Sequence, residues 1–264
     1  MRAIRVPLVL VGVVQLILAV GFFFQQGWAT SLWPVPDTRL SYAFIAAILA
    51  GGAVPLIWIG LSERYGGLAG YGLSFGIMYG GMALAALLFY LRSQQPALRV
   101  FALVIGVAAI LCVMLFFRAR TMDQNGQPTP RIVRLAFLIE VLILAGAGLL
   151  LLLKVPNTLP WNLSPESSVL YGWVFLGLAF YYLYAVLNSQ WIHALGPLLG
   201  FLVYDLVLFS PLFARFGSLQ PEHVRGQVAA SFIIVFSAAL GIYYLFLNPA
   251  TRLGSSPGAE RSQP

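Results

Sequence analysis

The chain alternates long apolar blocks with short polar segments, and this pattern predicts its architecture. Each block has about 18 to 25 residues, which at 1.5 Å per residue is enough to cross roughly 30 Å of hydrocarbon. The segments between them contain the glycine, proline or charged residues that are typical of turns. The blocks are residues 7–25, 42–61, 67–91, 100–117, 135–154, 169–188, 191–214 and 227–247. The pattern therefore predicts eight transmembrane segments.

The backbone of such segments must form its hydrogen bonds internally, because lipid offers no partners, so apolar blocks of this length are helices. The composition agrees, since 60% of the residues are hydrophobic, only 9% are charged and the mean hydropathy is +0.89. These values exclude a water-soluble globular class. We expect an all-α integral membrane protein of about eight transmembrane helices that is embedded in a lipid bilayer.

The basic residues indicate topology and not a nucleic-acid-binding surface, because they stand at the ends of the apolar blocks and do not gather in one segment. With the N-terminus inside, nine of them are cytoplasmic and six are outside. This bias favours N- and C-termini in the cytoplasm. The inner set is Arg2, Arg5, Arg64, Arg118, Arg120, Arg131, Arg134, Arg252 and Arg261, and the outer set is Arg39, Arg92, Arg99, Lys154, Arg215 and Arg225.

The first block, residues 7–25, is interpreted as a membrane helix and not as a cleaved leader. It is longer than the core of an ordinary signal peptide, and no clear A-x-A cleavage site accompanies it. A loop with Trp and Pro that precedes a helix occurs twice in the chain, and this arrangement resembles that of bacterial membrane proteins. We therefore expect the bacterial cytoplasmic membrane, although the resemblance implies no function.

Two stretches resemble each other and predict an internal duplication. SLWPVPDTRLSY (31–42) and TLPWNLSPESSVLY (158–171) both contain Trp and Pro, then polar residues, then a Tyr at the start of a helix, so that Trp33 pairs with Trp161. The preceding helices are also alike, QLILAVG against EVLILAGAG. The alternative is chance similarity, because Trp, Tyr and Pro are common in interfacial loops.

The duplication predicts the organisation of the chain. Residues 1–125 would form one four-helix half and residues 126–247 a second half. Because four is an even number, the two halves would share one orientation in the membrane. Residues 248–264 are rich in Pro, Ser and Gly and nearly devoid of apolar residues, which predicts a disordered tail.

Two carboxylates lie inside apolar blocks, and they are the first candidates for a functional site. A charge at membrane depth costs at least about 2.5 to 3.5 kcal/mol on insertion scales, so Asp205 and Glu140 need a reason to be there. In one hypothesis they line a proton or cation pathway together with Tyr204. In the other they are hydrogen-bonded between helices and only hold the bundle together. For Asp205 the two hypotheses are evenly balanced, whereas the position of Glu140 nearer the interface favours the structural one.

Glycine and proline residues suggest close packing and kinks in two helices. Gly196 and Gly200 are four residues apart beside Pro197 in the helix that carries Asp205. The 67–91 helix has the same four-residue spacing in Gly72, Gly76 and Gly80. Such spacings let two helix backbones approach each other. The approach can occur within the chain or across a homo-oligomer or complex interface.

No catalytic, cofactor or metal site is predicted. The chain has no GxSxG, HExxH or GxxxxGK[ST] motif, no histidine cluster and no lysine inside a helix. Its single cysteine, Cys112, excludes an intramolecular disulfide and a CxxC site. A membrane-embedded enzyme would need an interfacial group, for which only His193 and Glu63 are candidates, and we rank this class last.

Two hypotheses about function remain. In the first, the chain is a small transporter or channel-like protein for a small solute, proton or lipid, with a cavity between the halves lined by Asp205, Tyr204 and Glu140. In the second, it is a non-catalytic accessory or assembly subunit that docks onto a larger membrane complex through its glycine faces. They differ at Asp205, which must titrate in the first hypothesis and needs only to hydrogen-bond in the second.

Overall fold

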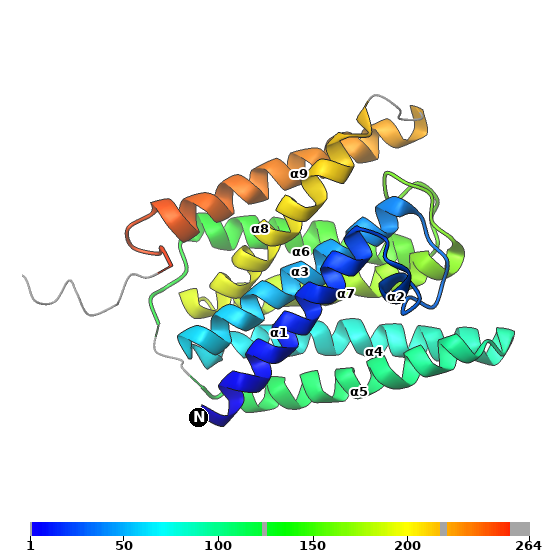
Figure 1. Ribbon diagram of the computed structural model, residues 1–264. Coiled ribbons are helices and arrows are strands. Elements are labelled where there is room, and N and C mark those ends of the chain that lie inside the picture. Colours follow the sequence, from blue (N-terminus) through cyan, green and yellow to red (C-terminus); the bar gives the residue numbers. More distant parts are fainter. Residues whose placement is uncertain (1, 123–125, 217–220, 254–264) are drawn as a thin grey trace, which may run out of the picture.

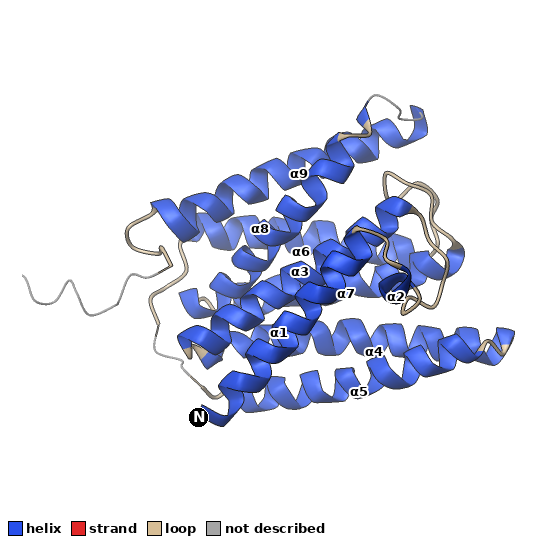
Figure 2. Cartoon of the chain, viewed as in Figure 1, coloured by secondary structure: helices blue, strands red, loops and turns tan. Residues whose placement is uncertain are grey.

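The computed structural model describes residues 2–122, 126–216 and 221–253, and it confirms the predicted all-helical membrane architecture (Figures 1 and 2). Eight helices in this part of the chain are long and apolar enough to span a membrane. They are α1 (Arg2–Phe23), α3 (Arg39–Ser62), α4 (Leu68–Ser93), α5 (Pro96–Ala119), α6 (Arg131–Leu152), α7 (Pro165–Leu187), α8 (Trp191–Phe213) and α9 (Val224–Ile242), which the π-helix η4 (Tyr243–Leu247) extends. Short helices α2 (Gly27–Thr30), η1 (Tyr65–Gly67) and η3 (Pro221–His223) lie in the connections.

Several helices start three or four residues earlier than the apolar blocks predict. Helix α3 begins at Arg39 after Thr38, whose hydroxyl accepts a hydrogen bond from the Ser41 amide, and Ser164 caps α7 in the same way. A polar cap and first turn lie outside the apolar block but belong to the helix. Helix α6 likewise begins at Arg131, four residues before the predicted start.

Four helices form the centre of the bundle and four lie around them. Between half and two-thirds of the residues in the spans of α3, α4, α7 and α8 are buried, compared with about a tenth to a third in α1, α5, α6 and α9. The outer helices expose large apolar side chains, for example Leu103 and Leu142. Such a surface is suited to lipid contact and would be unusual on a soluble monomer.

The helices pair in an order that recurs along the chain. Helix α1 packs on α3 and α4 packs on α5, while in the later part α6 packs on α7 and α8 packs on α9. The two groups are joined through α3 with α8 and α4 with α7. The central helices of residues 1–125 and 126–247 therefore share one core, and the predicted duplication stays a prediction.

Because the number of described spans is even, the end of the last span lies at the same end of the bundle as the start of α1. We call the end of the bundle that holds the start of α1 the N-terminal end and the opposite end the far end. Helix α9 and η4 return to the N-terminal end, at the left of Figure 1. The cytoplasmic location of this end stays a prediction.

The segment after η4 differs from the predicted disordered tail at its start. The Thr251 hydroxyl donates a hydrogen bond of 2.7 Å to the Tyr244 carbonyl, and the Leu253 amide donates one of 2.8 Å to the Leu245 carbonyl. These bonds fold residues 248–253 back on the helix end, so the boundary at 247 was set too early. The rest of the predicted tail, residues 254–264, lies outside the described residues.

The glycines of the two helices predicted to pack closely contact other helices of the same chain. Gly72 and Gly76 of α4 lie against α5, where a side chain at Gly72 would meet the Cys112 carbonyl at 2.7 Å. A side chain at Gly200 of α8 would meet the Gly51 carbonyl of α3 at 2.6 Å. These contacts support the packing interpretation, and they occupy the faces that the accessory-subunit hypothesis assigned to a partner.

Replacing Gly200 with Val should destabilise the bundle, because the added side chain forces α3 and α8 apart. We expect a loss of about 1 to 3 kcal/mol or more, as for other overpacked cores. The matched control is Gly146→Val in α6, where no atom lies within 4 Å of the added Cβ. Thermal unfolding in detergent, followed by circular dichroism, measures the difference. Equal midpoints for the two variants would contradict the close contact between α3 and α8.

Candidate functional site

Asp205 lies in the interior of the bundle, on the side of α8 that faces α9. Its side chain is 1% exposed and it is 14 residues into the helix, about 21 Å from the N-terminal end of α8 at 1.5 Å per residue. Its Oδ2 atom lies 2.6 Å from the Ser237 hydroxyl of α9, whereas Oδ1 is buried without a hydrogen-bond partner. No basic residue is among its partners in the described part of the chain. A carboxyl group in such an environment is costly at membrane depth.

A protonated Asp205 would account for both short contacts of Ser237. The serine oxygen lies 2.6 Å from Asp205 Oδ2 and also 2.6 Å from the Ile233 carbonyl oxygen. A hydroxyl has only one proton to donate. Both short contacts are hydrogen bonds if Ser237 donates to Ile233 and the Asp205 carboxyl donates to Ser237. A neutral carboxyl is also the form that costs least at this depth.

Glu140 lies close to Asp205 and deeper in the membrane than its position in the predicted block indicated. Because α6 starts at Arg131 and not at residue 135, Glu140 is about 14 Å into its helix and well away from the interface. Its side chain is 7% exposed and borders a cavity of about 10 Å³ together with Ser237 and Tyr182. Its carboxyl group is near enough to that of Asp205 for their charges to interact. The structure therefore unites the two predicted acids around Ser237.

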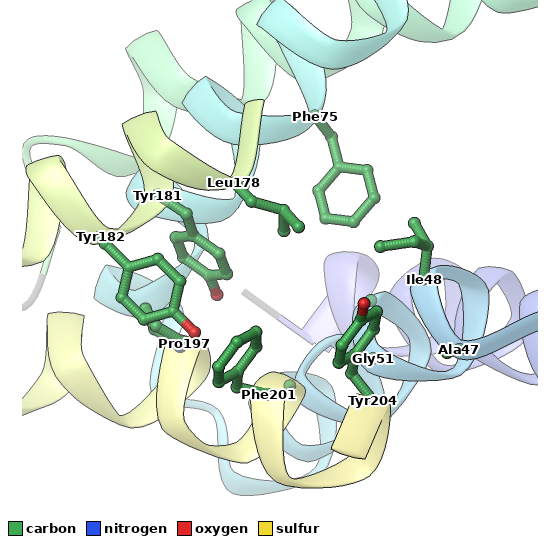
Figure 3. Close-up of a pocket in the computed structure, with 12 residues that line it drawn as sticks. Ala47, Ile48, Gly51, Phe75, Leu178, Tyr181, Tyr182, Pro197, Phe201 and Tyr204 are labelled. Atoms are coloured by element: carbon green, nitrogen blue, oxygen red, sulfur yellow. The ribbon is translucent and has the colours of Figure 1, made fainter. Parts of the chain in front are cut away.

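Tyr204, the third predicted residue, belongs to a neighbouring cavity of about 30 Å³ at the centre of the bundle (Figure 3). This cavity lies between α3, α4, α7 and α8, as the predicted cavity between the halves should, but neither acid lines it. The hydroxyl of Tyr181 points into it and has no partner in the described protein. The predicted lining of this cavity by Asp205 and Glu140 is thus wrong, and Glu140 instead borders the smaller cavity together with Tyr182 and Phe201.

The two cavities are adjacent, because Tyr182 and Phe201 border both of them. The ring of Phe201 stands edge-on to Tyr182 at 5.6 Å and stacks on Tyr204 at 5.5 Å. A water molecule needs about 10 to 15 Å³ of such space and two or more polar partners. The smaller cavity is barely large enough for one water molecule and the larger for about two.

Buried polar residues of η3 and α9 lie between Asp205 and the far end of the bundle, and the sequence analysis missed them. His223, Gln227 and Ser231 are spaced four residues apart, so they share one helix face, and Ser237 lies six residues after Ser231. They are between 0% and 8% exposed. We call these four residues, together with Asp205, the polar seam. Its signal was present in the sequence as polar residues at helical spacing, with His223 just before the 227–247 block and Gln227, Ser231 and Ser237 within it.

The polar seam is only partly satisfied by the protein. Gln227 donates a hydrogen bond of 2.5 Å to the Leu212 carbonyl of α8, but its own oxygen has no partner. The Ser231 hydroxyl and His223 Nδ1 are also buried without a partner in the described residues. Buried polar groups normally pair with protein or with ordered water. The seam is therefore suited to hold water or to pass protons.

Between the central cavity and the N-terminal end lies His193, which is buried near the start of α8. Its ring stands edge-on to Tyr184 at 5.3 Å, and its Nδ1 atom has no partner within the described chain. His193 is three residues before Gly196, against which the Tyr181 hydroxyl packs. Polar groups thus continue beyond the central cavity toward this end.

The described residues give little support to a metal site or to an interfacial enzyme site. They contain no group of three or more His, Cys, Asp or Glu side chains that could hold a metal ion. Glu63 is half exposed and pairs with Arg5 at 3.5 Å, whereas His193 is buried. The two candidates for an interfacial enzyme site therefore contact different residues, Glu63 contacting Arg5 and His193 contacting Tyr184.

Comparison with known proteins assigns neither a family nor a function to the chain. The chain matches no protein-family model, no curated protein and no solved structure. What the site does must therefore be inferred from its own residues.

We expect Ser237→Ala to destabilise the protein, because it leaves the buried Asp205 carboxyl without its partner. The loss should be about 1 to 3 kcal/mol, the usual cost of an unsatisfied buried polar group. Asp205→Asn should remain close to the wild type, since the amide can donate to Ser237 in place of the carboxyl. Thermal unfolding in detergent measures both variants, with Ser210→Ala on the exposed side of α8 as control. A large loss in Asp205→Asn alone would indicate that Asp205 is charged and contradict the neutral hydrogen bond.

Proposed function

We propose that the chain is a small channel-like or transporter-like membrane protein that moves protons, and that Asp205 and Glu140 carry them. The observation that carries the proposal is the buried pair of carboxyl groups around Ser237, which has no basic partner among the described residues. An acid in this environment can exchange a proton with a neighbouring group or water, and such acids in membrane helices are typical of proton relays.

The size of the two cavities nearest the acids favours the proton over the other cargoes. The central cavity of about 30 Å³ and the cavity of about 10 Å³ beside Glu140 hold water molecules, whereas ligand pockets have about 300 to 1,000 Å³. A proton needs only a chain of hydrogen-bonding groups and water. A larger solute would require the central helices to separate.

The polar groups follow one another in an order that would give protons a route through the bundle. From the far end, the polar seam leads from His223 along α9 to Ser237 and Asp205. Beyond the acids, the rings of Tyr182 and Phe201 stand between this path and the central cavity, which Tyr181 lines. These two rings would act as the barrier that opens when water enters. We place the N-terminal end of the route in the cytoplasm, in agreement with the arginine distribution.

The helix contacts also support the proposed duplication. Gly51 of α3 lies against Gly200 of α8, and Gly177 of α7 lies against Ser74 of α4. Gly177 follows Gly51 by 126 residues (177 − 51), and Gly200 follows Ser74 by the same interval (200 − 74). Equivalent contacts at a constant offset are what a two-fold axis along the membrane normal produces.

Two further pairs have the same offset. The N-cap residues Thr38 and Ser164 are 126 residues apart (164 − 38), and so are the LILA sequences at 16–19 and 142–145 (142 − 16). This offset replaces the pairing of Trp33 with Trp161, which are 128 residues apart (161 − 33). We propose two tandem repeats whose central helices enclose the cavity of Figure 3.

Proton flux into liposomes tests the proposal. The purified protein is reconstituted with a pH-sensitive dye inside, and a potassium gradient with valinomycin imposes a membrane potential. We expect faster acidification than in protein-free liposomes, and Asp205→Asn should reduce the rate to the protein-free level because an amide cannot exchange the proton. Glu166→Gln, which changes an exposed carboxylate at the far end, should leave the rate unchanged.

Wild-type flux equal to that of protein-free liposomes would refute proton translocation, and full flux in Asp205→Asn would refute the role of the acid. The accessory-subunit alternative predicts a different result in native mass spectrometry of protein gently extracted from its host membrane. A stoichiometric partner chain would support that alternative, whereas a monomer or homo-oligomer would support autonomous activity.

A further inference from the structure

A polar cavity lies at the far end of the bundle, separate from the two cavities nearest the acids. It has a volume of about 600 Å³, which is within the range of ligand-binding pockets. The end of α1, the start of α3, the segment before α7 and the end of α8 border it, toward the right of Figure 1. Because three of these elements are the ends of membrane spans, the cavity lies at the level of the lipid headgroups.

The lining of this cavity is positively charged. It includes Arg39 and Arg215, whereas none of the described aspartate and glutamate residues borders it. Arg39 is exposed and makes no ion pair with another described residue. Thr38, Asn162 and Ser210 add hydroxyl and amide groups to the lining, and all three residues are exposed. A ligand from the surrounding medium can therefore reach these groups.

Arg215 is anchored at the wall of the cavity. Its Nη1 donates a hydrogen bond of 3.2 Å to the Pro160 carbonyl oxygen, which ties the end of α8 to the segment before α7. A guanidinium group has five N–H donors in a planar fork, and this fork matches the oxygens of phosphate and carboxylate groups. Since the side chain is already half-buried and bonded on one side, it loses less conformational entropy when it binds a ligand.

The first turn of α3 adds positive potential to the same place. Thr38 is the N-cap of this helix, and Leu40 in its first turn also lines the cavity. The first amide groups of a helix have no acceptor within it and attract anions, above all phosphate. Asp37, the neighbouring carboxylate, does not line the cavity. Its Oδ2 accepts hydrogen bonds of 2.8 Å from Ser167 and Tyr171, so that it is engaged by α7.

We propose that this cavity binds a phosphate ester whose anionic oxygens accept hydrogen bonds from Arg39 and Arg215. A single arginine fork can satisfy both oxygens of a carboxylate, whereas a phosphate has further oxygens for a second arginine and for helix amides. Basic pockets between transmembrane helices are suited to anionic headgroups. The phosphate of a phospholipid and that of a soluble ester offer the same chemistry, and experiment separates these two sources. The site involves neither Asp205 nor Glu140.

Native mass spectrometry of the full chain in mild detergent tests the site. The probes are phosphatidylglycerol, whose phosphodiester is its only charge, and diacylglycerol with the same acyl chains and no phosphate. We expect phosphatidylglycerol to bind and diacylglycerol to bind at least tenfold more weakly. Arg39→Gln should weaken phosphatidylglycerol binding by about tenfold or more, the effect of losing a hydrogen bond between charged groups. The matched control is Arg99→Gln, which removes an exposed arginine of α5 at the far end that does not line the cavity.

A second variant tests the cavity without changing its charge. Ala214→Trp introduces a large ring from an exposed position at the end of α8 and should also abolish binding. Isothermal titration with glycerol 3-phosphate then identifies the source of the phosphate. Affinity equal to that for phosphatidylglycerol would assign the site to soluble esters, and affinity at least tenfold lower would assign it to the membrane lipid.

Three results would overturn the proposal. The first is equal binding of the phosphate probes by Arg39→Gln and Arg99→Gln, because the contribution of the cavity arginine would then be no larger than that of any charge at this end. The second is diacylglycerol that binds as tightly as phosphatidylglycerol, since the phosphate would then contribute nothing. The third is the absence of binding of both phosphate probes to the wild type.

Discussion

The absence of water in the hydrocarbon layer is the constraint on which the rest of the structure depends. It requires the backbone to form helices, and it makes each buried polar side chain costly unless a partner is found. The contact between Asp205 and Ser237 at 2.6 Å is the clearest consequence, because a single serine hydroxyl must serve both the carboxyl and the Ile233 carbonyl. A proton on Asp205 resolves this competition. The proposed function rests on the same contact. Because no basic residue pairs with Asp205 in the described part of the chain, its carboxyl group could give up this proton to a neighbouring group and take up another.

Close packing of the central helices limits what this site can transmit. Where Gly51 and Gly200 bring α3 and α8 together, no space for a side chain remains. The cavity that survives beside this contact is only about 30 Å³. Small, separated cavities joined by aromatic rings are compatible with protons and water, and they exclude larger cargo unless the helices move. In the proposed function, packing and selectivity would therefore be consequences of the same glycine contacts.

The proposed repeat would place different side chains at equivalent positions of the two halves. At the offset of 126 residues, Asp205 corresponds to Tyr79 (205 − 79). Tyr79 borders an apolar cavity between α1, α3, α4, α5 and α7, whereas Asp205 belongs to the polar seam. Phe101 of α5 similarly corresponds to Gln227 of α9 (227 − 101). Equivalent positions would thus have diverged, with apolar or aromatic residues in the first half and polar residues in the second.

The sequence alone determined the helical membrane class, the eight spans and the two acids, because hydrophobic length and the cost of buried charge are local properties of a segment. It also contained the four-residue spacing of His223, Gln227 and Ser231, which was overlooked at the start of the last apolar block. Only the tertiary structure decided that Glu140 lies close to Asp205 and that Tyr204 lines a different cavity. These facts depend on where helix α6 begins and on which helices are neighbours, and contacts between residues far apart in the chain leave no periodic signal in the sequence.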